Sequence, residues 1–284
     1  MKKLFFTINV IITLAICSVF LSGCSLVTTL LRDEKVEVMD FNQPLELKKP
    51  VQPVKKNPRI LFIGNSFTYY HELPSVFLEL SVSGGFEPDI YDLTAGSYRL
   101  QMFADENDEV GSQVYDALKN YEWDYVVLQE QSRIPAMAPE DLMYPAARTL
   151  DTMIHQANGE TVFFMTWAYK EGDSYEVFGK EHTNTREEMQ TKLAQGYIKI
   201  ADELDSMLVP AGIAFIRCAS QHPDIELWDE DLNHSSPAGT YLTACVFYAS
   251  LFGQSPAGLA YTAEVNAQTA AILQQVAAET VLTE

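Results

Sequence analysis

The stretch Arg59-Ile-Leu-Phe-Ile-Gly-Asn-Ser-Phe-Thr68 places a short apolar run directly before a glycine, a polar pair and a new amphipathic pattern. Ile60–Ile63 is apolar at every position, which is typical of a parallel strand buried on both faces. Gly64 permits a sharp turn, and Asn65 and Ser66 stand where the free N–H groups of a helix start are expected. The stretch therefore predicts a strand, a tight turn and a helix whose first turn carries a serine.

The same alternation of strand-like and helix-like patterns recurs along the chain. Further strands are predicted at Asp89–Leu93, Tyr125–Leu128, Thr161–Thr166 and Gly212–Arg217. Helices are predicted at Pro74–Ser83, Val110–Lys119, Pro145–Ala157, Glu187–Met207, Pro237–Leu251 and Ala263–Thr280. Together these elements indicate an α/β fold, a three-layer α/β/α sandwich with a five-stranded parallel sheet. Residues 167–186, between a strand and a helix, are expected to form a loop or lid.

Composition and charge limit the possible partners. The 284 residues are 47% apolar and 11% aromatic, which suits a folded domain with a sizeable core. The formal net charge of −20 argues against nucleic acid, whose phosphates require a cationic face. The same charge gives no electrostatic attraction to an anionic membrane, so we expect any membrane link to be covalent or apolar.

The N-terminus supplies a candidate for such a link. Lys2 and Lys3 precede an apolar run that ends in Leu21-Ser-Gly-Cys24. Small residues just before a cysteine resemble a bacterial lipoprotein signal, which is cut before the cysteine and leaves its thiol diacylated. This resemblance implies a signal peptide at residues 1–23, lipidation of Cys24 and a place in the cell envelope outside the cytoplasm. A permanent membrane-spanning anchor is the alternative.

The chain that follows is expected to have two parts. Residues 24–57 mix prolines and lysines without a sustained period, which predicts a flexible tether. The folded domain is then expected at residues 58–284. Cys218 and Cys245 are the two cysteines that remain in it, and both fall in apolar runs that favour buried free thiols.

Polar residues follow three of the predicted strands directly. They are Gly64-Asn65-Ser66, Ala95-Gly96-Ser97 and Gln129-Glu130-Gln131-Ser132. The carboxyl ends of parallel strands open into one crevice, where ligands of such sheets bind. Each group alone also suits a helix cap or an ordinary polar loop. Their coincidence at successive strand ends favours a site at this edge.

Asp231 and His234 are the most informative pair near the C-terminus. A spacing of three brings two side chains together, and a carboxylate beside one ring nitrogen leaves the other free to act as a general base. A capping aspartate with a surface histidine is one alternative. A metal site is another, because oxygen and nitrogen ligands gather in this segment at His222, Asp224, Asp229, Glu230, Asp231 and His234.

Gly64-Asn-Ser-Phe-Thr68, the glycine after the second strand and Asp231-Leu-Asn-His234 resemble the SGNH/GDSL hydrolase superfamily. Val127-Leu-Gln-Glu-Gln-Ser132 and the residues after His234 are similar to a bacterial branch of secreted SGNH proteins. The resemblance implies a flavodoxin-like sandwich and serine esterase chemistry without a cofactor. It further implies Ser66 as nucleophile, His234 as base and Asp231 as its partner.

The resemblance also implies an oxyanion hole, but the sequence departs from the family pattern there. The N–H groups of Ser66 and Gly96 match two donors, and a side-chain amide is expected as the third. Asn65 replaces the usual aspartate, and the usual Gly-x-Asn-Asp string is absent. Gln129, directly at the strand end, is therefore predicted to supply the amide, with Gln131 as the alternative.

The family resemblance and the N-terminal signal pattern together imply an extracytoplasmic lipoprotein that hydrolyses esters, with O-acetyl groups on carbohydrate as the expected substrate. Four aromatic residues are candidate sugar-stacking faces: Trp167, Tyr169, Tyr175 and Trp228. The alternative function is a non-catalytic glycan-binding or surface-interaction lipoprotein on the same fold. The missing Gly-x-Asn-Asp string keeps that alternative open.

Overall fold

The computed structural model describes residues 36–177 and 180–282. Within it, chain contacts separate two units. The larger unit comprises Val38–Asp173 and Thr185–Glu284, and the smaller includes Ser174–Asn184. The predicted signal peptide at residues 1–23 and Cys24 lie outside the described residues.

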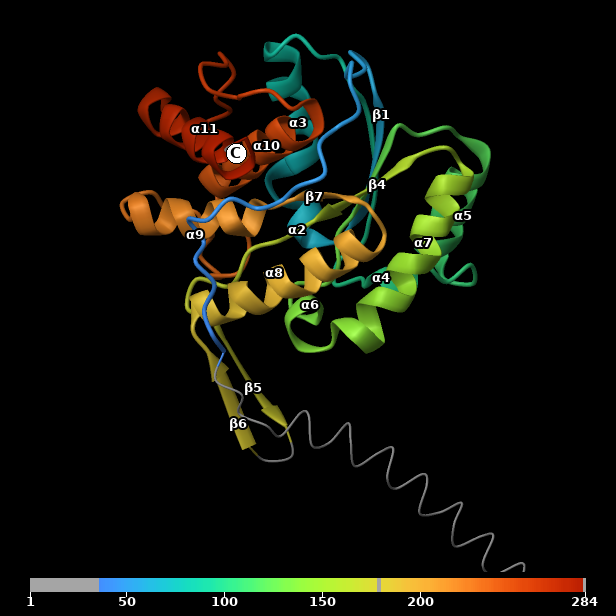
Figure 1. Ribbon diagram of the computed structural model, residues 1–284, viewed down its shortest axis with the longest axis horizontal. Helices are drawn as coiled ribbons and strands as arrows, with labels where there is room; N and C mark the ends of the chain where they lie inside the picture. The colour runs from blue at the N-terminus through green and yellow to red at the C-terminus, as the bar shows by residue number, and fades with distance from the viewer. Residues whose placement is uncertain (1–35, 178–179, 283–284) are drawn as a thin grey trace, which may run out of the picture. The chain divides into compact units, whose positions relative to one another are not determined.

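A parallel sheet forms the centre of the larger unit (Figure 1). Its five strands have the order β2-β1-β3-β4-β7. Their bounds are β1 (Arg59–Gly64), β2 (Asp89–Thr94), β3 (Tyr125–Leu128), β4 (Glu160–Phe164) and β7 (Met207–Val209). Every neighbouring pair runs parallel. This confirms the predicted five-stranded parallel sheet, and it aligns the carboxyl ends of all strands along one edge.

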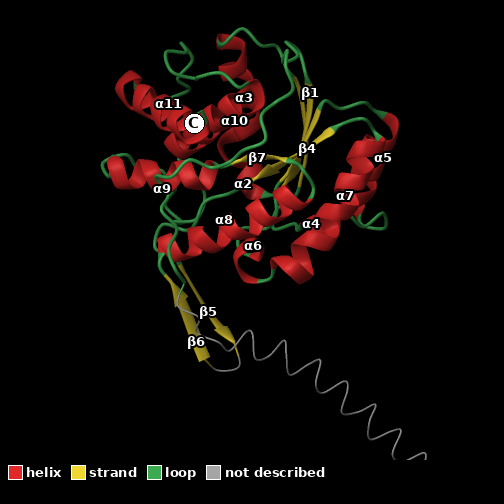
Figure 2. Ribbon diagram, in the orientation of Figure 1, coloured by secondary structure: helices red, strands yellow, loops and turns green. Residues whose placement is uncertain are grey.

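Helices cover both faces of the sheet (Figure 2). One face, which includes Ile60 and Phe62, packs against α3 (Leu73–Ser83), α10 (Pro237–Phe252) and α11 (Ala267–Val281). The other face, which includes Leu61 and Ile63, packs against α4 (Leu100–Phe103), α5 (Glu109–Asn120), α7 (Tyr144–Gln156) and α8 (Arg186–Glu203). Alternate residues of β1 thus enter opposite cores, as the all-apolar run of this strand requires.

Short elements complete the larger unit. They are α2 (Ser66–Tyr69), η1 (Tyr70–Glu72), α6 (Ile134–Met137), η2 (Pro139–Met143) and α9 (Ala211–Gln221). None of the helices in the described part of the chain combines the length and apolarity needed to cross a bilayer. Cys218 and Cys245 are buried and unpaired, as predicted.

The predicted fifth strand is wrong. Gly212–Arg217 lies inside helix α9, and the fifth strand is Met207–Val209, of which the prediction had placed Met207 at the end of a helix and the other two residues in no element. The reason lies in the packing of α9. Ile213 and Ile216 face one core while Ala214 and Phe215 face the other, so the helix is buried all round and shows no polar period.

The predicted tether also extends too far along the chain. Residues 38–57, here called the N-terminal strap, belong to the larger unit. Phe41 is buried, and the guanidinium of Arg217 donates hydrogen bonds to the carbonyls of Phe41 and Gln43. Arg217 itself is nearly buried, and a buried guanidinium requires such acceptors. The strap therefore supplies hydrogen-bond acceptors to the buried Arg217 guanidinium of α9, which would lack them without the strap.

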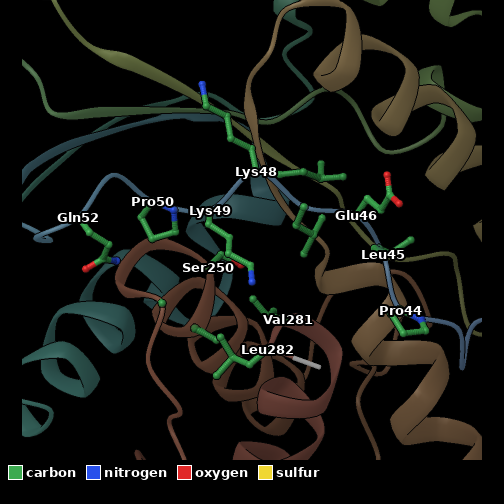
Figure 3. A pocket seen from close by; sticks show the side chains of 14 residues that line it. Pro44, Leu45, Glu46, Lys48, Lys49, Pro50, Gln52, Ser250, Val281 and Leu282 are labelled. Atoms are coloured by element: carbon green, nitrogen blue, oxygen red, sulfur yellow. The ribbon is translucent and has the colours of Figure 1, made fainter. Parts of the chain in front are cut away.

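A cavity of about 750 Å³ lies between the strap, β7, α10 and α11 (Figure 3). Its lining is largely apolar and includes Leu45, Leu47 and Leu208. The side chain of Lys49 extends into it between Ser250 and Val281 (Figure 3). None of the predicted catalytic residues lines this cavity.

The predicted loop or lid at residues 167–186 contains a β-hairpin. Strands β5 (Asp173–Val177) and β6 (Lys180–Asn184) form a two-stranded sheet. Within it the rings of Tyr175 and His182 stack at 5.4 Å between centroids. The hairpin residues Ser174–Asn184 belong to the smaller unit.

Candidate active site

Ser66 is the first residue of α2 and follows β1 after a turn of one residue. Asn65 caps the helix, because its Oδ1 accepts a hydrogen bond from the Phe67 N–H at 3.2 Å. The Asn65 side-chain amide also donates to the Tyr98 carbonyl at 2.9 Å, which ties the turn to the loop after β2. The serine hydroxyl is thus presented from a turn fixed on both sides.

Gln129 braces this turn from below and is completely buried. Its Oε1 accepts from the Asn65 N–H at 2.7 Å and from the Thr68 hydroxyl at 3.0 Å, and its Nε2 donates to the Glu130 carbonyl. Both ends of the amide are therefore engaged inside the protein. Its amide supports the nucleophile turn, and one N–H of Nε2 has no partner among the described residues, so the prediction that Gln129 supplies an oxyanion donor stays a prediction.

Only glycine fits the packing at position 64. A Cβ at position 64 would stand 2.3 Å from the Thr68 Oγ1 and 2.6 Å from the Gln129 Oε1. Both atoms belong to the bracing network, so neither has room to withdraw without losing a hydrogen bond.

Asp231 and His234 lie on a compact loop that leads into α10. The Asp229 N–H donates to the His234 carbonyl at 2.8 Å, and the Leu232 N–H donates to the Asp229 carbonyl at 2.9 Å. One carboxylate oxygen of Asp231 accepts from the N–H groups of Asn233 and His234, each at 2.9 Å. The carboxylate therefore organises its own loop before it contacts the imidazole.

The loop after β4 holds this Asp-His loop in place. The Trp167 indole donates to the Asn233 carbonyl at 2.9 Å, and the Lys170 N–H donates to the Leu232 carbonyl at 2.9 Å. In return, the Trp228 indole donates to the Ala168 carbonyl at 3.0 Å. Trp167 and Trp228 are both buried, so the interpretation of these two as sugar-stacking faces is wrong. Their sequence signal was ambiguous, because an indole suits a core as well as a sugar site.

The structure brings Ser66, His234 and Asp231 together, with the imidazole between the hydroxyl and the carboxylate. The Ser66 hydroxyl lies 2.8 Å from the His234 Nε2, across 168 residues of chain. The His234 Nδ1 makes a short hydrogen bond to the second carboxylate oxygen of Asp231. Burial acts to raise the pKa of Asp231, but the hydrogen bonds from the imidazole and from the N–H groups of Asn233 and His234 outweigh it and lower the pKa. Asp231 is thereby kept as a carboxylate beside the imidazole.

Aromatic rings fix the plane of the imidazole. Tyr70 stacks on His234 with 4.1 Å between centroids and 12° between planes, and Phe67 lies 5.2 Å away at a tilt. The next residue, His71, contacts the Asp229 carboxylate at 3.2 Å. His71 and Glu72 both have left-handed backbone angles, which non-glycine residues rarely adopt. Sequence reasoning left His71 without a role, because nothing in its pattern shows that it meets the Asp-His loop.

Two backbone donors are available beside the serine. Ser66 and Gly96 each stand two residues beyond the paired Gly64 and Thr94 of neighbouring strands. Among the described residues, neither the Ser66 N–H nor the Gly96 N–H has a hydrogen-bond partner. The nearest atom to a Cβ built on Gly96 is the Tyr69 hydroxyl, at 3.2 Å, on the same short helix as Ser66.

Gln131 lies closer to solvent than Gln129. Its side-chain carbonyl accepts from the Arg133 N–H at 3.0 Å, and its Nε2 donates to the Ser132 hydroxyl at 3.2 Å, which leaves one N–H of the amide. The Ser132 hydroxyl in turn lies 2.7 Å from the Tyr169 hydroxyl. Burial raises the pKa of Tyr169 against the lowering effect of its hydrogen bond with Ser132.

Glu130, between the two glutamines, is a buried carboxyl that sequence reasoning did not single out. One oxygen accepts from the N–H groups of Leu100 at 3.2 Å and Gln131 at 2.6 Å. The other oxygen has no partner among the described residues. Burial raises the pKa of Glu130 to about 7 against the lowering effect of these hydrogen bonds. Only its position directly behind a buried strand hinted at this environment.

The alternative of a metal site at residues 222–234 finds no support in the geometry. Within residues 36–177 and 180–282, no three His, Cys, Asp or Glu side chains gather closely enough to hold an ion. Asp231 and His234 instead face each other, and Asp229 faces His71.

Comparisons with known proteins were informative at the level of solved structures. No protein-family model and no curated protein matches the chain. A protein from Slackia heliotrinireducens assigned to the SGNH hydrolases is similar at 26% identity, over 69% of this chain and 99% of that one, with a TM-score of 0.59. A DUF4886 family protein from Bacteroides uniformis is similar at 18% identity, over 80% and 95%, with a TM-score of 0.64. A GDSL-like lipase from Parabacteroides merdae is similar at 17% identity, over 72% and 99%, with a TM-score of 0.51.

Proposed function

The chain belongs to the SGNH/GDSL hydrolase superfamily, and from this premise we propose that it is a serine ester hydrolase that removes O-acetyl groups from neutral carbohydrate outside the cytoplasm. The observation that carries the proposal is the contact of 2.8 Å between the Ser66 hydroxyl and the His234 Nε2. A serine within hydrogen-bond reach of an imidazole whose other nitrogen meets a carboxylate is the arrangement that activates a serine nucleophile.

In the proposed reaction the Ser66 hydroxyl attacks the ester carbonyl while His234 Nε2 takes its proton. The tetrahedral intermediate then collapses to an acyl-serine, and His234 gives the proton to the departing sugar alkoxide. Water repeats the sequence and releases acetate. Asp231 holds the proton-bearing Nδ1 and stabilises the imidazolium, and the stacked Tyr70 ring keeps the imidazole from turning away.

The proposed oxyanion hole uses the N–H groups of Ser66 and Gly96, which have no partner among the described residues. Because Gln129 is completely buried whereas Gln131 is partly exposed, the third donor in this proposal is the remaining N–H of Gln131. One such donor contributes about 3–4 kcal/mol to transition-state stabilisation.

The electrostatics of the site favour an uncharged substrate. Asp229, Glu230 and Asp231 share the loop that carries His234, Glu72 directly follows the His71 that contacts Asp229, and the whole chain carries a net charge of −20. An anionic substrate would be repelled by this field, whereas an acetylated neutral sugar would not. The location outside the cytoplasm rests on the N-terminal signal pattern. Metabolic labelling with a radioactive fatty acid, in the native chain and in Cys24→Ala, tests it.

Hydrolysis of p-nitrophenyl acetate tests the reaction. We expect Ser66→Ala and His234→Ala to abolish it, while the matched replacements Ser112→Ala and His155→Ala, away from the triad, leave it unchanged. Activity is expected to survive EDTA and to fall on acidification, because a protonated imidazole cannot accept the serine proton. A rate that does not fall on acidification would contradict the role of His234.

Release of acetate identifies the substrate class. We expect acetate from acetylated xylan, and much less from acetylated sialic acid, which is anionic. If the protein is inert toward all acyl esters and toward serine-directed phosphonates, the alternative of a non-catalytic glycan-binding lipoprotein replaces this proposal.

A further inference from the structure

A group of aromatic residues surrounds Arg59 at the amino-terminal end of the sheet. We call Arg59, Tyr91, Tyr121 and Trp123 the Arg59 cluster. The guanidinium carbon of Arg59 lies 5.3 Å from the ring centroid of Tyr91, 5.0 Å from that of Trp123 and 6.0 Å from that of Tyr121. These are cation–π distances, so one charged side chain holds three rings in place.

Two of these rings are ordered and yet exposed. Tyr91 is 44% exposed and Tyr121 is 53% exposed, whereas Trp123 is buried. Trp123 contacts Tyr91 edge to face at 5.4 Å and Tyr121 at 6.4 Å, so the exposed rings rest on a buried indole. Rings held in this way lose little further conformational freedom when a ligand covers them.

A polar groove of about 820 Å³ adjoins the cluster at Tyr121. Amide side chains line it at Asn120, Gln156 and Asn158, and Tyr115 and Ser112 add hydroxyls. Arg59 also pairs with the exposed Asp89 at 3.2 Å. Tyr121 therefore lines a groove of amides and hydroxyls and also contacts an arginine that is paired with an aspartate.

This combination fits the chemistry of a sugar. A pyranose ring presents an apolar face that stacks on an exposed aromatic ring and a rim of hydroxyls that bind amides, carboxylates and guanidinium groups. Carboxylates at Glu106, Asp116 and Glu122 line the groove beside a single lysine, Lys119. A polyanionic glycan would be repelled there, so the site suits a neutral one.

We propose that the Arg59 cluster and its groove form a second, non-catalytic binding site for a neutral polysaccharide. Arg59 begins β1, and Ser66 follows the end of the same six-residue strand. At about 3.3 Å per residue the two lie roughly 20 Å apart, so a sugar unit bound at the cluster does not reach the serine. A polymer spans this distance, and holding it there raises the concentration of its other units near the site of Ser66. The binding itself does not rest on the proposed hydrolysis.

Affinity electrophoresis of the full chain in gels containing a neutral polysaccharide tests the proposal. Unsubstituted xylan and hydroxyethyl cellulose are the neutral probes, alginate is the anionic control, and the Ser66→Ala background separates binding from turnover. We expect retardation by at least one neutral polymer and none by alginate. Tyr121→Ala should weaken binding by about tenfold, whereas Tyr121→Phe, which keeps the ring, should retain it.

Tyr121 is exposed, so its replacement is expected to leave folding and p-nitrophenyl acetate hydrolysis unchanged. A urea midpoint equal to that of the Ser66→Ala parent is the check that Tyr121→Ala is folded in the background used for binding. The proposal is overturned if neither neutral polymer retards the protein, or if Tyr121→Ala binds as well as the native chain. It is also overturned if sedimentation shows a dimer that Tyr121→Ala dissociates, because the rings would then be an interface between two copies.

Discussion

Replacing Gln129 by leucine separates a bracing role from a catalytic one. Gln129 Oε1 accepts two hydrogen bonds in a fully buried position, from the Asn65 N–H at 2.7 Å and from the Thr68 hydroxyl at 3.0 Å. Gln129→Leu keeps a similar volume but leaves both donors without an acceptor. Each unsatisfied buried group costs about 1–3 kcal/mol, so we expect the free energy of unfolding to fall by about 2–6 kcal/mol.

Urea denaturation of the purified protein measures this loss, and p-nitrophenyl acetate hydrolysis is followed in parallel. Thr68→Val removes only one of the two donors from the same acceptor and should cost about 1 kcal/mol. Gln131→Leu is the matched control on the same loop. It lies nearer to solvent, so it should change stability by less than about 1 kcal/mol while lowering kcat by about 10²–10³ if its amide is an oxyanion donor.

The opposite pattern would refute the bracing role. If Gln129→Leu unfolds within about 0.5 kcal/mol of the native chain, the size of an ordinary surface change, but loses kcat by about a hundredfold or more, its amide acts on the reaction and not on the turn. In that case the hydrogen bonds from Asn65 and Thr68 to Gln129 would not be present in the active enzyme.

Three further changes test the site. Burial raises the pKa of Glu130 to about 7, so its contribution to stability is fully present below its unfolded pKa and is lost as pH rises through 7. Glu130→Gln should remove about 2–4 kcal/mol of this pH dependence of the free energy of unfolding. Equal pH dependence of thermal unfolding in the variant and the native protein would contradict this expectation. Asp231→Asn should lower kcat by about 10³–10⁴ with little change in the melting temperature, because the imidazole loses the partner that selects its tautomer; steady-state kinetics would show otherwise if kcat fell less than about tenfold. Gly64→Ala should destabilise by about 1–3 kcal/mol, since its Cβ would stand 2.3 Å from the Thr68 hydroxyl, and an unchanged urea midpoint would count against that packing.

Four strands of the sheet were predictable, three of them (β1, β3 and β4) because they are short apolar runs that the core buries. The fourth, β2, is a largely exposed edge strand, and its isoleucine and tyrosine gave the signal. Predicted Ile60–Ile63, Asp89–Leu93, Tyr125–Leu128 and Thr161–Thr166 overlap β1 to β4. The fifth was not, because β7 has only three residues and directly follows a helical pattern. A strand that short gives no period to recognise.

The N-terminal strap shows a second limit. Its prolines and lysines are typical of a tether, and nothing in their order reveals the buried Arg217 that binds the carbonyls of Phe41 and Gln43. Backbone acceptors are the same in every sequence. A segment recruited through its carbonyls is therefore hard to predict from side chains alone.

The candidate site likewise has residues that the sequence located and one assignment that it did not settle. Polar residues after strand ends located Ser66 and Gly96, and spacing located Asp231 with His234. The choice between Gln129 and Gln131 was not accessible, because both amides have the same chemistry and only burial separates them.

The rule that chemistry follows each strand accounts for only part of the catalytic geometry. Ser66 follows β1, but Asp231 and His234 follow helix α9, and no strand positions them. Their loop is held by backbone carbonyls that accept from Trp167 and Lys170, and by the contact between Asp229 and His71. The left-handed residues His71 and Glu72 bring that histidine and the stacked Tyr70 onto the loop. Because strained residues persist only where their surroundings hold them, this turn and the Asp-His loop stabilise each other, and the 2.8 Å contact between serine and histidine depends on both.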